Sequence, residues 1–441
     1  MPETTSTPAV LGQQRERRQV VRTIVGTAAG NAVEWFDWAV YATFASFIAG
    51  QLFSPENPSS AFLMTLAIFA VGFVARPVGG FVFGWIGDKV GRKTSMTLSV
   101  ALASLGSLAI ALTPSYELIG SGASLMLVIA RLVQGLAHGG ELPSAQTYLC
   151  EMAPAERRGL WSSLIYVSGT VGILFGTLLG AVLSTVLSSE QMSAFGWRIP
   201  FALGAVFGLV ALVMRSRLAE STVFAGEKGS AAPQSKPNLI AEMAKHWRKA
   251  LQVIGMTVGL TVVYYVWGVS TPAYAINVLG IDPKQALWAG AAANLVFIVL
   301  LPMWGRLSDK VGRRPVMLVC TAALIIAYFP ASAILKDSAI QLAVSMSLML
   351  VFISGVCAIA PAIFSELFPT SVRTIGVAVP YAICVAAFGG TAAYLQAGFE
   401  AWLGAGGRTV FGAYAVVLLL ISLITVLTIR EGRGRDLSVN D

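Results

Sequence analysis

Twelve apolar runs of about 20 residues, separated by short polar segments, constrain the fold of this 441-residue chain more than any other feature. They cover 22–50, 61–85, 94–113, 124–150, 158–187, 197–215, 250–278, 286–307, 314–335, 339–364, 375–398 and 408–430. A helix of about 20 apolar residues crosses the hydrocarbon core and satisfies its own backbone. Barrel strands are shorter and alternate in hydropathy. The sequence therefore predicts an all-α polytopic membrane protein with twelve transmembrane helices.

Charged residues are few, at 12% of the chain, and they are distributed unevenly. If the N-terminus lies in the cytoplasm, 24 of the 30 Lys and Arg residues fall in cytoplasmic loops and tails. This bias predicts that both termini are cytoplasmic. It also accounts for the net charge of +8, so we expect a lipid bilayer around the chain and no nucleic acid partner.

The longest polar segment divides the runs into two sets of six. We predict a cytoplasmic N-terminal tail, a six-helix half, a cytoplasmic linker, a second six-helix half and a cytoplasmic C-terminal tail. These parts cover residues 1–21, 22–215, 216–249, 250–430 and 431–441.

Two motifs occur once in each half and in the same order. The segments 84–93 and 305–314 share six of ten residues, and both contain Asp-Lys-Val-Gly-Arg. The Glu and Pro of 151–154, with an Arg seven residues after the Glu, match those of 366–369 at the same spacing. Basic loops end many membrane helices, but that explanation does not cover the matching Asp, Glu, Gly and Pro. The repeats indicate duplicated halves, which is a transporter architecture with a central binding site.

The segment Gly-x-x-x-Asp-Lys-x-Gly-Arg-Lys at 84–93 resembles the signature of the major facilitator superfamily. The segments 31–37, 76–80, 131–135, 139–141 and 196–201 are similar to those of its metabolite:proton symporter family, especially the members that carry 2-oxoglutarate. The resemblance implies alternating access, proton symport and the inner membrane of a bacterium. It also implies that two matching sets of charged groups gate the cytoplasmic face. The first set is Asp88, Arg92 and Glu151, and the second is Asp309, Arg313 and Glu366.

Ionisable residues inside predicted spans are candidates for function because they are costly to place in lipid. Helical spacing puts Glu34, Asp37 and Tyr41 on one face of the first span and Arg131, Gln134, His138 and Glu141 on one face of the fourth. Burial and neighbouring cations act in opposite directions on the proton affinity of a carboxyl group. We therefore expect Asp37, then Glu34 or Glu141, to carry the coupling proton. A permanent ion pair of Glu34 or Asp37 with an arginine is the alternative.

Arginine suits a carboxylate because its guanidinium donates a bidentate pair. We expect substrate contacts from both halves: Arg76, Arg131, Gln134, His138, Tyr41, Tyr264, Tyr265 and Tyr381. His138 could instead be a packed residue. The three tyrosines of the second half could instead be core or lipid-interface residues.

A proton symporter that imports 2-oxoglutarate or a similar carboxylate is the function that these features favour. Symport of a shikimate-like acid, or of proline or betaine, stays open; the proline and betaine members tend to carry a C-terminal coiled coil, which is not expected here. The span-1 motif argues against a drug or sugar exporter. An enzyme or receptor is disfavoured because no catalytic set, metal cluster or nucleotide loop occurs. We expect no cofactor other than the coupling proton, and a monomer.

Overall fold

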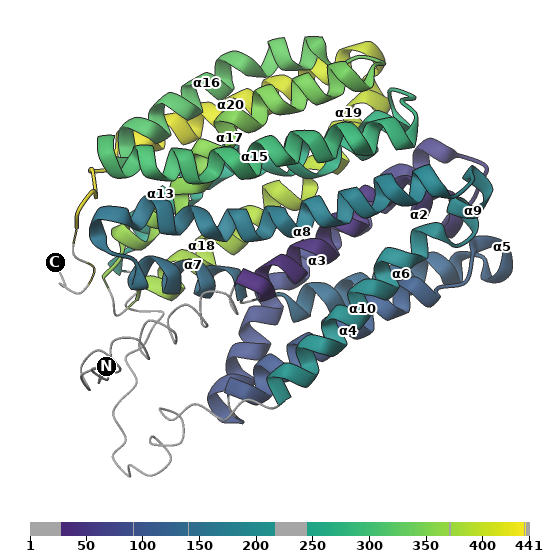
Figure 1. Cartoon of the computed structure of the whole chain (residues 1–441), viewed down its shortest axis with the longest axis horizontal. Helices are drawn as coiled ribbons and strands as arrows, with labels where there is room; N and C mark the ends of the chain where they lie inside the picture. Colours follow the sequence, from purple (N-terminus) through teal and green to yellow (C-terminus); the bar gives the residue numbers. More distant parts are fainter. Residues whose placement is uncertain are drawn as a thin grey trace, which may run out of the picture.

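The structure is a computed structural model that describes residues 28–90, 92–139, 141–216, 245–369, 372–435 and 437. Its helices run side by side along one direction, and those of the first half form one group beside those of the second half (Figure 1). The tail 1–21 and most of the linker 216–249 lie outside the described residues, as do the side chains of Asp88, Arg92 and Glu141.

The described part of the first half consists of six helical spans, several of them broken. They are residues 28–43 with α2 (Ala45–Leu52), α3 (Pro58–Lys89), α4 (Arg92–Leu112), α6 (Ser121–Ala137) with α7 (Glu141–Met152), α8 (Arg158–Val186) and α10 (Ile199–Ser216). Short helices connect them: α5 (Tyr116–Ile119), η1 (Ala155–Arg157), α9 (Ser189–Ala194) and η2 (Gly196–Arg198). Each span coincides with one predicted apolar run.

The second half repeats this arrangement. Its spans are α13 (Trp247–Val263) with η3 (Tyr264–Ser270) and α14 (Thr271–Asn277), α15 (Pro283–Val311), α16 (Arg313–Ile334), α17 (Ala339–Leu367), α18 (Arg373–Cys384) with η4 (Val385–Gly389) and α19 (Gly390–Leu403), and α20 (Gly407–Leu427). The 3-10 turn η5 (Gly404–Gly406) precedes α20. The predicted all-helical fold with six spans in each half is confirmed.

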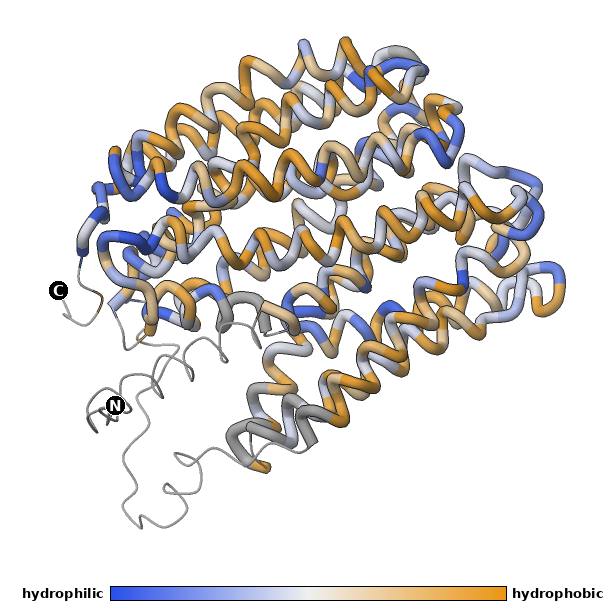
Figure 2. Tube along the Cα trace, in the orientation of Figure 1, coloured by the Kyte–Doolittle hydropathy of each residue, from blue (hydrophilic) through white to orange (hydrophobic). Residues whose placement is uncertain are grey.

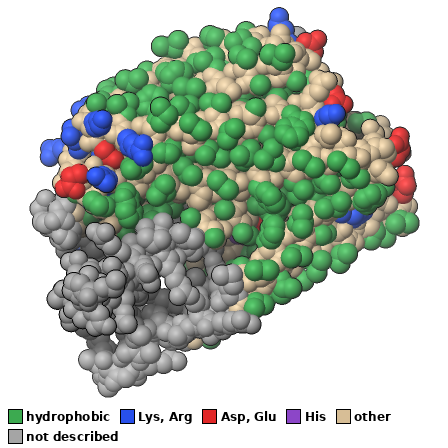
Figure 3. Space-filling model, in the orientation of Figure 1, with side chains coloured by type: hydrophobic (Ala, Val, Ile, Leu, Met, Phe, Trp, Pro, Cys, Tyr) green, Lys and Arg blue, Asp and Glu red, His purple; other side chains and the backbone are tan. Residues whose placement is uncertain are grey.

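Apolar and polar residues are distributed over the helices as expected for a protein that spans a membrane. Apolar residues cover the length of the helices, and polar residues gather at their two ends (Figure 2). The space-filling view shows a broad apolar face with Lys, Arg, Asp and Glu at the ends of the bundle (Figure 3). Within the described residues, nine continuous helices are long and apolar enough to cross a bilayer.

Four spans are interrupted where the sequence analysis predicted continuous runs. The run 22–50 is divided at Phe44, the N-cap of α2. The run 124–150 is divided between α6 and α7, and the break follows His138, the C-cap of α6. The runs 250–278 and 375–398 contain the π-helical segments η3 and η4. Such wide turns place side chains differently from a regular helix and are frequent at functional sites. Apolar composition gave no sign of them, because a π-helical turn needs no change in hydropathy.

Candidate functional site

Two arginines, one buried and one 11% exposed, share one aromatic ring in the interior of the first half. The Cζ atom of Arg76, on α3, lies 4.1 Å from the ring centre of Trp38, and that of Arg131, on α6, lies 4.3 Å from it. Arg131 also lies over the ring of Tyr41, at 4.3 Å. Guanidinium groups are attracted to ring faces, and more strongly away from water. The rings therefore hold two cations next to one another in the interior of the bundle.

Glycines allow the helices that carry these arginines to touch. A Cβ atom at Gly79, Gly135 or Gly139 would overlap backbone atoms of the facing helix. The backbones of α3 and α6 are therefore in contact, which brings Arg76 and Arg131 to the same ring. Small residues at helix crossings serve this purpose in membrane proteins.

A chain of hydrogen bonds connects Arg131 to Asp37. The Nη1 atom of Arg131 donates to Oε1 of Gln134 at 2.8 Å, and Nε2 of Gln134 donates to Oγ of Ser107 at 2.7 Å. The Ser107 hydroxyl donates to Oδ1 of Asp37 at 3.1 Å. The Nε2 atom of His138 lies 3.9 Å from the other carboxyl oxygen, Oδ2. The predicted residues Asp37, Arg131, Gln134 and His138 are thus brought together.

Glu34 and Asp37 lie one helical turn apart but have different partners. Glu34 forms an ion pair with Arg76, with 3.2 Å between Oε1 and Nη2. Within the described part of the chain, no ion pair joins Asp37 to an arginine. Glu34 thus has an arginine as its ion partner, and Asp37 has none among the described residues.

The tyrosines of the second half face the same region from the π-helical turn η3. Tyr265 stacks on Trp35 with ring centres 6.1 Å apart, and it meets Phe73 edge to face at 5.0 Å. Tyr264 meets Trp35 edge to face at 5.5 Å. Because Trp35 belongs to the first half, these contacts cross the boundary between the halves. Tyr381, in α18, is buried beside Phe364, with ring centres 6.3 Å apart.

The described side chains of the site are mostly buried. Arg131 is 1% exposed and Asp37 is 5% exposed, and the rings of Tyr41 and Tyr265 are also buried. The hydroxyl of Tyr41 is occupied by a 2.9 Å hydrogen bond to the carbonyl of Thr65. The described residues therefore show an occluded state of the centre, in which a ligand would be shielded from both surfaces.

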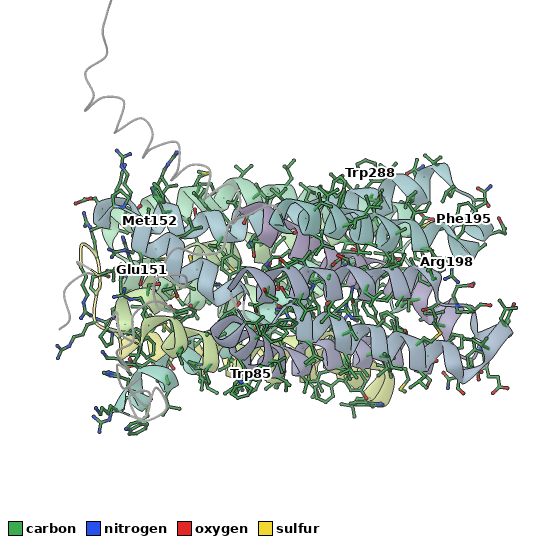
Figure 4. All side chains as sticks on the ribbon, turned by 90° about the horizontal axis from the view of Figure 1, so that it is seen from below. Trp85, Glu151, Met152, Phe195, Arg198 and Trp288 are labelled. Carbon is green, nitrogen blue, oxygen red and sulfur yellow. The ribbon has the colours of Figure 1, made fainter. Side chains whose placement is uncertain are left out.

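At one end of the bundle, each Glu of the second repeated motif pairs with the Arg of the other half. The Nη1 atom of Arg158 lies 2.9 Å from Oε1 of Glu366, and Nη1 of Arg373 lies 2.7 Å from Oε1 of Glu151. We call this end the basic end; Figure 4 shows Glu151 and Met152 there. The matching residues of the repeat thus exchange partners across the boundary between the halves.

Asp309 makes a further connection at the basic end. Its carboxyl oxygens accept hydrogen bonds from the backbone N–H groups of Gly159 and Leu160, at 2.8 and 2.9 Å. These groups are unpaired at the start of α8, where the helix dipole favours a carboxylate. Gly305 and Gly159 permit the approach, since a Cβ at Gly305 would lie 2.6 Å from the Gly159 carbonyl oxygen. Gly305 and Asp309 are four residues apart, so they lie on the same face of α15, and both contact the start of α8.

Arg313 completes this arrangement. Its Nη1 atom lies 2.9 Å from Oδ1 of Asp309, and its Nε atom lies 3.6 Å from Oε1 of Glu366. The predicted set Asp309, Arg313 and Glu366 is therefore in mutual contact. Glu151 of the first set lies nearby, while the side chains of Asp88 and Arg92 are not described.

Comparison with known proteins identifies the family. Residues 23–440 match the family described as "Sugar (and other) transporter". The chain belongs to this transporter family. It is 34% identical to the alpha-ketoglutarate permease of Escherichia coli K12 over 440 residues, covering 99% of this chain and 100% of the relative. It is 29% identical to the proline/betaine transporter of the same organism, covering 94% and 84%. A putative proline/betaine transporter of Staphylococcus aureus COL is 33% identical, covering 85% and 81%.

Solved structures agree on the fold of this transporter. A D-xylose-proton symporter matches with a TM-score of 0.73 at 18% identity, covering 94% of this chain and 99% of that one. A partially occluded inward-open form of the xylose transporter XylE from E. coli matches at 0.72 and 18%, covering 93% and 98%. The fold is that of the major facilitator superfamily. Its membership of the transporter family makes the chain a secondary transporter and not an enzyme.

The opposite end of the transporter is joined by neutral groups. Nδ2 of Asn277 donates to Oγ of Ser46, and Nε1 of Trp288 donates to Oγ1 of Thr185 at 3.3 Å. Both bonds connect the two halves. Figure 4 labels Phe195, Arg198 and Trp288 at this end. The two ends are therefore held differently, by charge pairs at the basic end and by single hydrogen bonds between neutral groups at the other.

Sequence reasoning missed several of these residues. Trp38 and Ser107 resemble ordinary residues of apolar spans, and only the packing shows their roles. Glu400 pairs with Arg408, with 3.4 Å between Oε1 and Nη2, and also accepts a hydrogen bond from Tyr274. Glu400 lies between the predicted runs 375–398 and 408–430, so nothing in the sequence singled it out. Glu400 and Arg408 thus lie near the end of α19 and the start of α20.

Proposed function

We propose that this transporter is a proton symporter that imports a small organic acid, with 2-oxoglutarate or a similar dicarboxylate as the favoured substrate. The observation that carries the proposal is the environment of Arg131. This guanidinium is buried, yet among the described residues its Nε and Nη2 atoms have no hydrogen-bond partner. Buried donors are normally paired. A carboxylate that enters the site would accept from these two donors.

Arg76 supplies the second cation. Its partner Glu34 balances its charge in the occluded state. A second substrate carboxylate would compete with Glu34 for this guanidinium. Two cations held by one ring suit a ligand with two carboxylates, because each guanidinium can donate a bidentate pair. The relative named alpha-ketoglutarate permease supports this choice.

A zwitterion is the second candidate, and a specific feature supports it. Trp35, Tyr264 and Tyr265 form a cluster of rings next to the site. Aromatic clusters of this kind bind quaternary ammonium groups. A betaine could place its carboxylate on Arg131 and its ammonium among these rings. The relatives named as proline/betaine transporters support this reading.

Proton coupling is assigned first to Asp37. Its carboxyl group is buried and has no arginine ion pair among the described residues. It accepts a hydrogen bond from the Ser107 hydroxyl. Alternating exposure to the two surfaces would change its hydration and so its proton affinity. Glu34 is the second choice, since its pairing with Arg76 opposes protonation, and Glu141 stays a candidate.

The basic end would face the cytoplasm, with both termini and the linker 216–249 on that side, as the distribution of Lys and Arg favours. The charge pairs there would keep the cytoplasmic side closed while the opposite end opens. We expect the transporter to act as a monomer in a bacterial inner membrane.

Uptake by purified protein in proteoliposomes tests this function. Labelled 2-oxoglutarate should accumulate when an inward proton gradient is imposed, and a protonophore should abolish accumulation. Competition with unlabelled glutarate, shikimate, proline and glycine betaine ranks the substrates. Accumulation driven by a sodium gradient and unaffected by the protonophore would refute proton symport. Strong competition by betaine and none by glutarate would replace the dicarboxylate with the zwitterion.

A further inference from the structure

We propose that Ser107 is the positioning residue that couples the proton site to the substrate site, by relaying the charge state of Asp37 through Gln134 to Arg131. The inference rests on the proposed function, because it assigns how the proton and the anion sense one another. It concerns a residue that carries no charge and contacts neither cation directly.

The direction of each hydrogen bond in the chain is fixed by chemistry. A guanidinium can only donate, so the atom of Gln134 that faces Arg131 must be the amide oxygen. The amide nitrogen of Gln134 then donates to Ser107 Oγ, as the 2.7 Å distance indicates. The single hydrogen of the Ser107 hydroxyl is left to donate to Asp37. The complete chain therefore requires an acceptor at Oδ1 of Asp37.

Protonation of Asp37 at Oδ1 changes this arrangement. That atom becomes a donor, so the Ser107 hydroxyl must accept from it and turn its own hydrogen elsewhere. A serine in a helix can donate to the carbonyl one turn back. Ser104, on the same helix, does so, with 2.7 Å to the carbonyl of Val100. The bond between Ser107 and Asp37 thus reverses when the proton binds.

The reversal reaches Arg131 because hydrogen bonds in a chain polarise one another. With Asp37 ionised, a negative charge at one end and a guanidinium at the other strengthen every bond between them. When Asp37 is neutral, its charge no longer strengthens the chain, and the hydrogen bond between Arg131 and Gln134 is weaker. Arg131 is then freer to bind an anion. Proton binding would therefore favour substrate binding, so that the proton and the substrate are carried together.

The packing around Ser107 leaves little room for another route. Asp37 lies between α4 and α10, and a Cβ at Gly204 of α10 would meet its Oδ1 atom. His138, at the end of α6, faces the other carboxyl oxygen at 3.9 Å. Ser107 is fully buried, so its hydroxyl has no access to bulk water. Within the described residues, Ser107 forms the hydrogen-bonded bridge between Asp37 and Gln134.

A double-mutant cycle on ligand affinity tests the relay. The dissociation constant of 2-oxoglutarate would be measured by titration calorimetry on purified full-length protein in detergent. Asp37→Asn removes the negative charge permanently. In the wild-type background this substitution should lower the dissociation constant by about fivefold or more, and in the Ser107→Ala background by less than about twofold. An equal change in both backgrounds would overturn the relay.

Matched variants separate the relay from simple packing. Ser104→Ala makes the same substitution one turn earlier on α4, facing Gly208 of α10, and should leave the effect of Asp37→Asn intact. Ser107→Thr keeps a hydroxyl and should restore at least part of the effect. Loss of the effect in Ser104→Ala as well would assign it to the packing of α4 and refute the relay.

Gln134→Glu provides a second test if Ser107→Ala does not fold. The introduced carboxylate can accept from Arg131 but cannot donate to Ser107, so it draws the serine hydrogen away from Asp37. The effect of Asp37→Asn should disappear there too, and its persistence would contradict the relay. If the wild type bound betaine and no dicarboxylate, the substrate assignment would fail. The same cycle measured with betaine would then decide the relay separately.

Discussion

The carboxylate of Glu366 accepts a 2.9 Å hydrogen bond from Arg158 across the boundary between the two halves, and both side chains are almost fully buried. The matching pair, Arg373 and Glu151, has the same chemistry, but Glu151 is 39% exposed. An internal duplication thus produced two pairs of equal composition and unequal environment. The two pairs are therefore expected to differ in their effect on the conformational equilibrium.

The first prediction compares these two glutamates. Glu366→Gln leaves buried Arg158 without a carboxylate, while Arg313 keeps Asp309, and breaking a buried pair costs about 3–5 kcal/mol. Glu151→Gln breaks a partly exposed pair, which contributes about 0–1 kcal/mol. Labelling of single-cysteine reporters from each side should show a much larger shift towards opening at the basic end for Glu366→Gln. Arg157→Gln, at an exposed neighbouring position, is the control. Equal shifts from both glutamate variants would show that burial does not set their contribution.

The second prediction concerns the contact between α8 and α15. Gly305→Ala places a Cβ 2.6 Å from the Gly159 carbonyl oxygen, so the helices must separate and Asp309 must lose its bonds to the start of α8. We expect faster labelling from the basic end and a thermal stability lower by about 1–3 kcal/mol. Gly50→Ala, a helical position with open space around it, is the matched control. A Gly305→Ala protein with unchanged labelling would show that the close contact is not needed for closure.

The third prediction separates Asp37 from Glu34. Asp37→Asn keeps the shape and polarity of the group but cannot exchange a proton, so uphill uptake should be lost while counterflow persists. Glu34→Gln leaves the mostly buried Arg76 unpaired and should mainly reduce stability and substrate affinity. Proteoliposome assays of uphill uptake and counterflow distinguish the two outcomes. Normal uphill uptake by Asp37→Asn would remove this residue from the coupling role.

The fourth prediction concerns the two arginines over Trp38. Arg131→Lys keeps the charge but loses the planar donors, and a charge-assisted hydrogen bond contributes about 1.5–3 kcal/mol, so the dissociation constant for 2-oxoglutarate should rise about tenfold or more. Arg76→Lys should also weaken binding. Arg248→Lys, an exposed arginine near the ring of Trp247, is the control and should bind like the wild type. Unaltered affinity in both site variants would exclude direct contact with the substrate carboxylates.

The fifth prediction uses the neutral contacts at the opposite end. Asn277→Ala removes the hydrogen bond to Ser46 and should increase labelling from that end, the reverse of Glu366→Gln. A neutral hydrogen bond contributes about 0.5–1.5 kcal/mol, so the population ratio should change about tenfold at most. Thr185→Val, which removes the acceptor of Trp288, should act in the same direction. Labelling that decreases in both variants would contradict a closing role for these bonds.

Sequence alone determined the features that depend on composition and period. Twelve apolar runs of about 20 residues required helices, because in lipid only helices and closed barrels satisfy the backbone, and barrel strands are shorter and alternate in hydropathy. The duplicated motifs required two related halves, and helical spacing placed Glu34, Asp37 and Tyr41 on one face. These properties are local, so they could be read without knowing which helices touch.

Tertiary structure decided the partners. Nothing in the sequence indicates that Glu366 pairs with Arg158 of the other half, that Glu34 takes Arg76 while Asp37 does not, or that Trp38 lies under both arginines. Ser107 gave no signal, because one hydroxyl in an apolar span acquires its role only from the groups that surround it. Partner choice depends on how helices distant in sequence approach, and glycines at their crossings set that distance to within an ångström. The sequence therefore supplied the charged groups, and packing determined which of them interact.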